Sequence, residues 1–156
     1  MRKSMTVFIA LALLASGGVA WALDTNTLTV SASVVGTCKF TVPKTSTLDF
    51  GALDPSVVGP VNGTTSTTFW CTKGVTTDTI TADLGANPSG STRRMKDIGV
   101  GTDLIPYSLT LAPLAGTNAG PDVPRTLNIN GTVAYDDFKS VSAGNYADTV
   151  ILTINN

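Results

Sequence analysis

The chain contains no histidine and no glutamate, so its 11 acidic residues are all aspartates. Without histidine, neither a Ser-His-Asp triad nor a Cys-His pair can be built, which excludes the commonest arrangements for nucleophilic catalysis. A metal site would need more ligands than the two thiols of this chain. The pair Asp136-Asp137 lacks the Asp-x-Asp-x-Asp-Gly loop of a calcium site, and we interpret it as a solvated turn. We expect no enzyme, no catalytic or cofactor-binding residue, no cofactor and no metal.

Residues that favour helices are also scarce, because glutamine is absent and lysine is sparse, whereas threonine is abundant. The missing residues stabilise exposed helix faces, and threonine suits strands. We therefore expect a nearly all-β domain. The charges almost balance, with 10 Lys and Arg against 11 Asp, and they form no large basic block. This argues against nucleic acid as a partner.

A long apolar run occurs near the N-terminus. A positive start at residues 2–3 precedes an apolar run at 7–15, and a small-x-small cleavage site follows at 20–22. The run falls short of the roughly 20 residues that a spanning helix needs. We predict that residues 1–22 are an export signal, cleaved after Ala22, and that the mature chain is a single domain without a membrane span.

Cysteine occurs at two positions, Cys38 and Cys71. In an exported chain such a pair is most simply a disulfide. In the chain-entropy model, closing a loop of this size stabilises a domain by about 3 to 4 kcal/mol. We expect this disulfide and an oxidising compartment.

A strand pattern begins a few residues after the predicted cleavage site. Leu28, Val30, Ala32 and Val34 alternate with polar residues over 28–35, which is the period of a half-buried strand. A strand carried on a free end favours pairing with another molecule.

Further strands are expected at 38–42, 48–51, 65–72 and 76–84, with Pro, Gly and Asn clusters between them, including the Asn-Gly pairs at 62–63 and 130–131 as turns. Apolar and polar residues alternate most clearly in the second half of the chain, where three more strands are expected. The apolar residues on one face of each strand are Ile105, Tyr107, Leu109 and Leu111; Leu127, Ile129, Val133 and Tyr135; Tyr146, Val150, Leu152 and Ile154.

Short strands at this spacing predict an antiparallel sandwich, with a long loop at 112–124. The last strand ends close to Asn156, and an immunoglobulin-like sandwich would need one strand more. We expect an open groove in the core that a strand from elsewhere completes.

Three segments carry a family resemblance: Val-Ser-Ala-Ser-Val-Val-Gly-Thr-Cys at 30–38, Leu-Asp-Phe-Gly at 48–51, and Ala-Gly-Asn-Tyr-Ala-Asp-Thr-Val at 143–150. The chain resembles the spore coat protein U domain family, whose members include subunits of archaic chaperone-usher pili. The resemblance covers essentially the whole mature chain.

The resemblance implies an incomplete immunoglobulin-like domain at 37–156 that follows a donor-strand segment at 23–36. A periplasmic chaperone would complete the domain with its own strand, and an outer-membrane usher would then exchange that strand for the N-terminal strand of a neighbouring subunit. The donor residues would be Leu28, Val30, Ala32 and Val34, and the acceptor groove would be lined by Val150, Leu152 and Ile154. The product would be a surface pilus serving adhesion or biofilm formation.

Other readings remain open at this point. A secreted spore-coat or matrix protein would fold alone and pack through lateral contacts, and a self-contained sugar-binding module would need an aromatic platform on its surface. Trp70 is the candidate for such a platform, because alternation turns it outward if Phe69 and Cys71 face the core. The basic residues at 93–96 are interpreted as a charged sheet edge.

Overall fold

The computed structural model describes residues 23–75, 79–113 and 116–155. The predicted export signal at 1–22 lies outside the described residues. The chain divides after Ser33 into two units, and each is described by itself.

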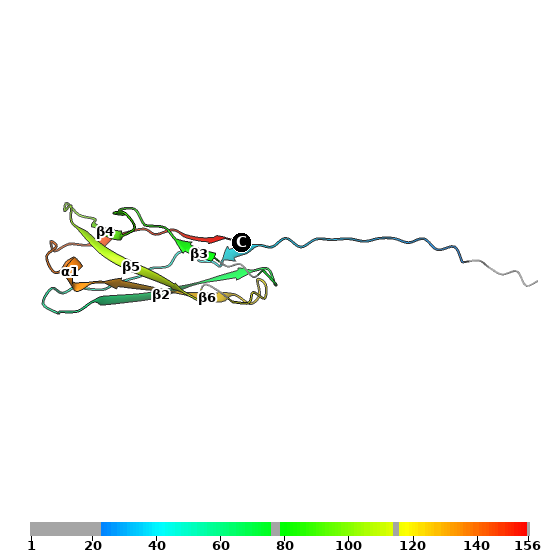
Figure 1. Cartoon of the computed structure of the whole chain (residues 1–156), viewed down its shortest axis with the longest axis horizontal. Helices are drawn as coiled ribbons and strands as arrows, with labels where there is room; N and C mark the ends of the chain where they lie inside the picture. The colour runs from blue at the N-terminus through cyan, green and yellow to red at the C-terminus, as the bar shows by residue number, and fades with distance from the viewer. Residues whose placement is uncertain (1–22, 76–78, 114–115, 156) are drawn as a thin grey trace, which may run out of the picture. The chain divides into compact units, whose positions relative to one another are not determined.

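The second unit is all β apart from one helical turn (Figure 1). Its elements are β1 (Cys38–Phe40), β2 (Val61–Cys71), β3 (Thr79–Ala82), β4 (Arg93–Asp97), β5 (Leu104–Ala112), β6 (Arg125–Val133), α1 (Tyr135–Phe138), β7 (Tyr146–Ala147) and β8 (Leu152–Asn155). Every strand pair is antiparallel, in a six-stranded sheet of order β1-β2-β6-β5-β4-β7 and a two-stranded sheet of β3 and β8.

The long central strands follow the predicted alternation. Ile105 and Tyr107 on β5, and Leu127, Ile129 and Val133 on β6, are buried, while Asn128 and Asn130 between them on β6 are exposed. The sheet buries one face only, as expected where apolar and polar residues alternate in an antiparallel sheet. Tyr135, predicted to extend this strand, lies instead in α1.

The core lies between the two sheets. One cluster joins Phe69 and Leu127 of the large sheet to Ile80 of β3, with Leu152 and Ile154 of β8 packed against it. This confirms an all-β antiparallel sandwich. A second cluster around Ile105, Tyr107, Val133 and Phe138 fills the end of the domain near α1, away from the C-terminus (Figure 1).

The predicted disulfide is confirmed. Cys38 and Cys71 are opposite each other in the β1–β2 pairing and are bonded to each other. Phe69 and Cys71 are buried, and Trp70 between them is half-buried on the other face. The bond fixes the start of the domain, because β1 is only three residues long.

Both Asn-Gly pairs were predicted as turns, and this is wrong. Gly63 lies within β2 and Gly131 within β6, and the two residues are opposite each other in the register. Both are buried. The lack of a side chain serves close packing here, and no reversal of the chain occurs at either position.

Two predicted strands, at 28–35 and 48–51, are not strands in the structure. A strand is defined by its neighbour, and neither segment has a ladder partner among the residues that the structure describes. β4 was not predicted as a strand, because four of its five residues are charged. It pairs with β5 along 93–96 and with β7 at Lys96 and Asp97, so the interpretation of residues 93–96 as a sheet edge is wrong for Lys96.

Candidate functional site

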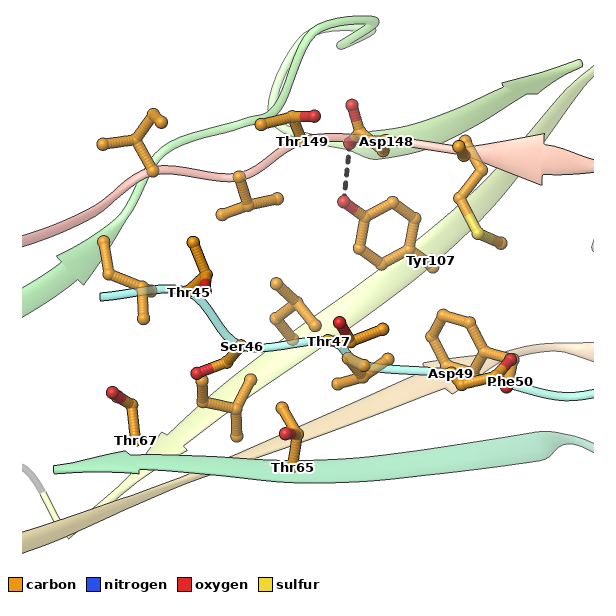
Figure 2. Close-up of a pocket in the computed structure, with 18 of the residues that line it drawn as sticks. Thr45, Ser46, Thr47, Asp49, Phe50, Thr65, Thr67, Tyr107, Asp148 and Thr149 are labelled. Carbon is orange, nitrogen blue, oxygen red and sulfur yellow. Dashed lines mark hydrogen bonds between the residues drawn. The ribbon is translucent and has the colours of Figure 1, made fainter. Parts of the chain in front are cut away.

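An open groove of about 630 Å³ runs along the second unit, between the two sheets. One wall is the segment 44–50, the other is the segment 146–152, and the inner face of the large sheet forms the floor (Figure 2). Apolar side chains predominate along it, among them Phe40, Leu48, Phe50, Leu109, Val150 and Leu152.

Both walls contain backbone without a ladder partner. Residues 44–50 and 148–151 belong to no strand. Within the described residues, no hydrogen bond involves the backbone of Thr149 or Val150. Unpaired backbone N–H and C=O groups along an apolar groove are the features of an unfilled position in a sheet.

The last segment is bonded on the side away from the groove. The Asp83 amide donates to the Ile151 carbonyl at 3.0 Å, and the Ile151 amide donates to the Asp83 carboxylate at 3.0 Å. Along an extended chain, the backbone groups of successive residues point to opposite sides. The backbone groups of Val150 and Leu152 therefore face the groove.

Asp83 acts as a charged acceptor at this edge. Its carboxylate accepts the Ile151 amide and, at 3.0 Å, the Gly85 amide. These hydrogen bonds, that of Ile151 first, lower the pKa of Asp83 below its ordinary value. The ionised form is thus the one that holds residue 151 in place.

A polar contact joins the floor to the last segment. The Tyr107 hydroxyl on β5 donates to the Asp148 carboxylate at 2.6 Å, as the dashed line in Figure 2 shows. Asp148 also accepts the Ala86 amide at 2.8 Å. Burial first, and then the Asp148 hydrogen bond, raise the pKa of Tyr107 well above its ordinary value, so the hydroxyl remains a donor.

The arginines of β4 hold the loop behind the groove. Arg93 donates to the carbonyl oxygens of Ala82 and Asp83, at 2.8 and 2.6 Å. Arg94 donates to the carbonyls of Asn87 and Pro88, at 2.9 and 3.0 Å. The two guanidinium groups thus bind the backbone of this loop. Spacing in the sequence gives no sign of these contacts.

Of the three predicted acceptor residues, two line the groove and one does not. Val150 and Leu152 line the groove, whereas Ile154 packs against the core cluster that includes Ile80 and does not line it. Sequence reasoning missed the opposite wall and the Tyr107–Asp148 contact. A strand was predicted at 48–51, which overlaps this wall, but no part in the groove was assigned to it.

The predicted donor residues are exposed. Leu28, Val30 and Val34 are 84%, 83% and 85% exposed, and Ala32 is also exposed. Burying apolar side chains that are this exposed would be strongly favourable.

Two further observations apply to the described part of the chain. It holds no group of three or more Cys and Asp side chains placed to bind a metal ion. It also contains no helix with the length and hydrophobicity to cross a membrane.

Sequence comparison adds the family. Among curated proteins, no sequence match was found. The Spore Coat Protein U domain matches residues 24–153, which include both walls of the groove. The chain belongs to the Spore Coat Protein U domain family.

Proposed function

We propose that this chain is a structural subunit of a surface pilus assembled by donor-strand exchange, with a periplasmic chaperone and an outer-membrane usher as assembly partners, and that the pilus serves adhesion or biofilm formation. The observation that carries the proposal is the groove between two segments that belong to no strand, 44–50 and 148–151. Family membership supports a structural subunit of this type.

The groove has the form that an added strand requires. In β-strand addition, main-chain hydrogen bonds provide affinity and pockets for alternate side chains provide specificity. The backbone of Val150 and Leu152 faces the groove, and apolar side chains line its floor. An inserted strand would pair with this edge and bury its own alternate residues on the floor.

The segment 23–36 is the donor in this proposal. Its apolar residues, Leu28, Val30, Ala32 and Val34, recur at every second position and are exposed. Burying four aliphatic side chains contributes on the order of 5 to 8 kcal/mol. The polar residues between them would stay at the surface.

A donor at one end and a groove at the other make a contact between two different surfaces. Such a heterologous contact forms an open chain of subunits unless rotation closes a ring. A pilus follows from this geometry. The signal at 1–22 and the disulfide Cys38–Cys71 fit export through an oxidising periplasm.

The test is an unboiled denaturing gel of the exported protein, coexpressed with a candidate chaperone. The full mature chain is compared with a chain lacking residues 23–35 and with Val30→Asp, which places a charge on the apolar face of the donor. The matched control is Ser31→Asp, which adds the same charge on the other face.

We expect a heat-sensitive ladder for the full chain and for Ser31→Asp, and monomer for the other two. A buried unpaired carboxylate costs several kcal/mol, whereas an exposed one costs little. Monomer in every lane would contradict the proposal. A ladder that Val30→Asp leaves intact would exclude this segment as the donor.

A further inference from the structure

We infer that a facing pair of glycines, Gly63 and Gly131, positions the segment 44–50 as the acceptor wall of the groove. The inference rests on the proposed function, because it assigns the residues that prepare this groove for a strand. Gly63 of β2 and Gly131 of β6 are register partners, and Leu109 of β5 is the register partner of Gly131 on its other side.

The segment 48–50 lies directly on this glycine pair. A Cβ atom on Gly63 would be 2.7 Å from the Asp49 carbonyl oxygen and 3.1 Å from Leu48 Cδ2. A Cβ atom on Gly131 would be 2.7 Å from Phe50 Cζ and 3.0 Å from Leu48 Cδ2. The two approaches of 2.7 Å are closer than van der Waals contact allows, and those to Leu48 are tight, so the close packing depends on both glycines.

The segment has few other attachments. Leu48 and Phe50 pack against the two core clusters, and the Phe50 ring makes an edge contact with Tyr107 at 6.1 Å between centroids. The hydroxyl of Ser46 donates to the Ser66 carbonyl at 3.3 Å. No strand pairing fixes the position of the segment 44–50. Its distance from the large sheet is therefore set by how closely it packs on the two glycines.

That height matters because a strand entering the groove must reach both walls. The opposite wall, at 148–151, is fixed by Asp83 and by the contact between Tyr107 and Asp148. If 44–50 is raised off the sheet, the two walls no longer share one layer, and one of the two hydrogen-bonded edges is lost. Figure 2 shows the two walls facing each other, with Asp49 and Phe50 on one and Asp148 on the other.

The two glycines differ in a way that makes the inference testable. At Gly63 the obstacle is a backbone carbonyl, which a side-chain change cannot remove. At Gly131 the nearest obstacle is the end of the Phe50 ring, which a smaller residue would relieve. Gly131→Ala should therefore be rescued by Phe50→Leu.

The experiment uses the full mature chain in five forms: wild type, Gly63→Ala, Gly131→Ala, the double variant Gly131→Ala with Phe50→Leu, and Asn130→Ala. Asn130 is adjacent to Gly131 but faces solvent, so its variant is the matched control. Hydrogen exchange of residues 46–51 is measured by mass spectrometry on the protein bound to the candidate chaperone, where an added strand would supply hydrogen-bond partners for these amides. The heat-sensitive ladder is measured on the same preparations.

We expect both single glycine variants to speed exchange at 46–51 about tenfold and to lower the ladder yield about tenfold, as overpacking predicts. Exchange in the centre of β5 and β6 should stay slow, which shows a retained fold. The double variant should recover both readouts, and Asn130→Ala should match wild type.

Unchanged exchange at 46–51 in Gly131→Ala would overturn the inference, and so would a double variant that does not recover. Altered exchange with a normal ladder would show that the glycines hold the segment without positioning an acceptor, and would also overturn it. Failure of the proposed function is a separate outcome, because the wild-type chain itself would then give no ladder.

Discussion

The contact between Tyr107 and Asp148 connects β5 to the segment that follows β7 through a single hydrogen bond of 2.6 Å. Its acceptor is a carboxylate, and hydrogen bonds to charged groups are stronger than neutral ones. The donor is buried and remains protonated, because its pKa is raised. Removing the hydroxyl leaves the carboxylate with one partner fewer, beside apolar residues.

We predict that Tyr107→Phe lowers the free energy of unfolding by about 1 to 3 kcal/mol, since a charged acceptor loses its donor. Urea unfolding at pH 7 measures the change. The control is Tyr135→Phe, whose hydroxyl donates to the exposed Pro55 carbonyl at 2.9 Å, and there we expect less than about 1 kcal/mol. Equal losses in the two variants would contradict the assigned role.

Asp83 makes the free energy of unfolding depend on pH. Its pKa is lowered in the folded protein, chiefly by the Ile151 amide and then by the Gly85 amide. A carboxylate of this kind stabilises the fold above its unfolded pKa of about 3.9, and that contribution is lost as pH falls through the folded pKa. The chain has no histidine, so no histidine titrates between these values and neutral pH.

We predict a urea midpoint that is flat from about pH 5 to 8 and falls below about pH 4. Asp83→Asn should weaken the fall, because the amide oxygen accepts the same N–H groups without titrating. Part of the fall should remain, since the pKa of Asp54 is also lowered, by Ser56. Asp122→Asn, at an exposed position, serves as the control, and an unchanged acid slope in Asp83→Asn would refute the assignment.

The strands show which elements can be predicted from sequence. β5 and β6 were predicted because apolar and polar residues alternate over nine positions in each. β4 was missed because its charged residues make no such pattern, and its Arg93 binds the carbonyls of Ala82 and Asp83, which are 11 and 10 positions away. Pairing with β5 and β7 makes it a strand, and such pairing depends on the whole fold.

The candidate site was partly predictable for the same reason. Alternation predicted Val150 and Leu152, which line the groove. It could not predict that Gly63 and Gly131 would be register partners on two strands, because that register depends on how the residues between them fold. Nor could alternation predict that Ile154 would pair with Ile80 and pack against the core instead of lining the groove.

Thr72 contributes a side-chain contact and a backbone hydrogen bond, from its amide to the Thr37 carbonyl at 2.8 Å, to the junction before β1. The Thr37 amide donates to the Thr72 hydroxyl at 3.0 Å, and that hydroxyl lies 3.2 Å from the Val35 carbonyl, to which it can donate. Thr72 thus extends the β1–β2 pairing toward the N-terminal segment. In the proposed pilus this is the point at which a donor strand leaves its own domain.

We predict that Thr72→Val increases amide exchange at residues 35–37 about five- to tenfold, because a hydrogen bond worth about 1 kcal/mol is lost at an exposed junction. Exchange measured by mass spectrometry reports this directly. Thr64→Val changes an exposed threonine elsewhere on β2 and should have no effect at 35–37. The same exchange in both variants would show that the hydroxyl does not hold the junction.

A subunit with one donor and one acceptor can be damaged at either end separately. A chain without residues 23–35 keeps the groove and lacks the donor. Val150→Asp keeps the donor and places a charge in the groove wall, where its carboxylate would be desolvated by an entering strand. Neither protein should polymerise alone, for different reasons.

Coexpression of these two proteins with the candidate chaperone should therefore give a heat-sensitive heterodimer and nothing larger. The donor of Val150→Asp enters the groove of the truncated chain, and growth stops there because the truncated chain has no donor and the other has no usable groove. Thr153→Asp, at an exposed position of β8 that does not line the groove, is the control and should still form a ladder by itself. A ladder from the mixed pair would require a second contact between subunits, and two monomers would mean that residues 23–35 and the groove are not partners.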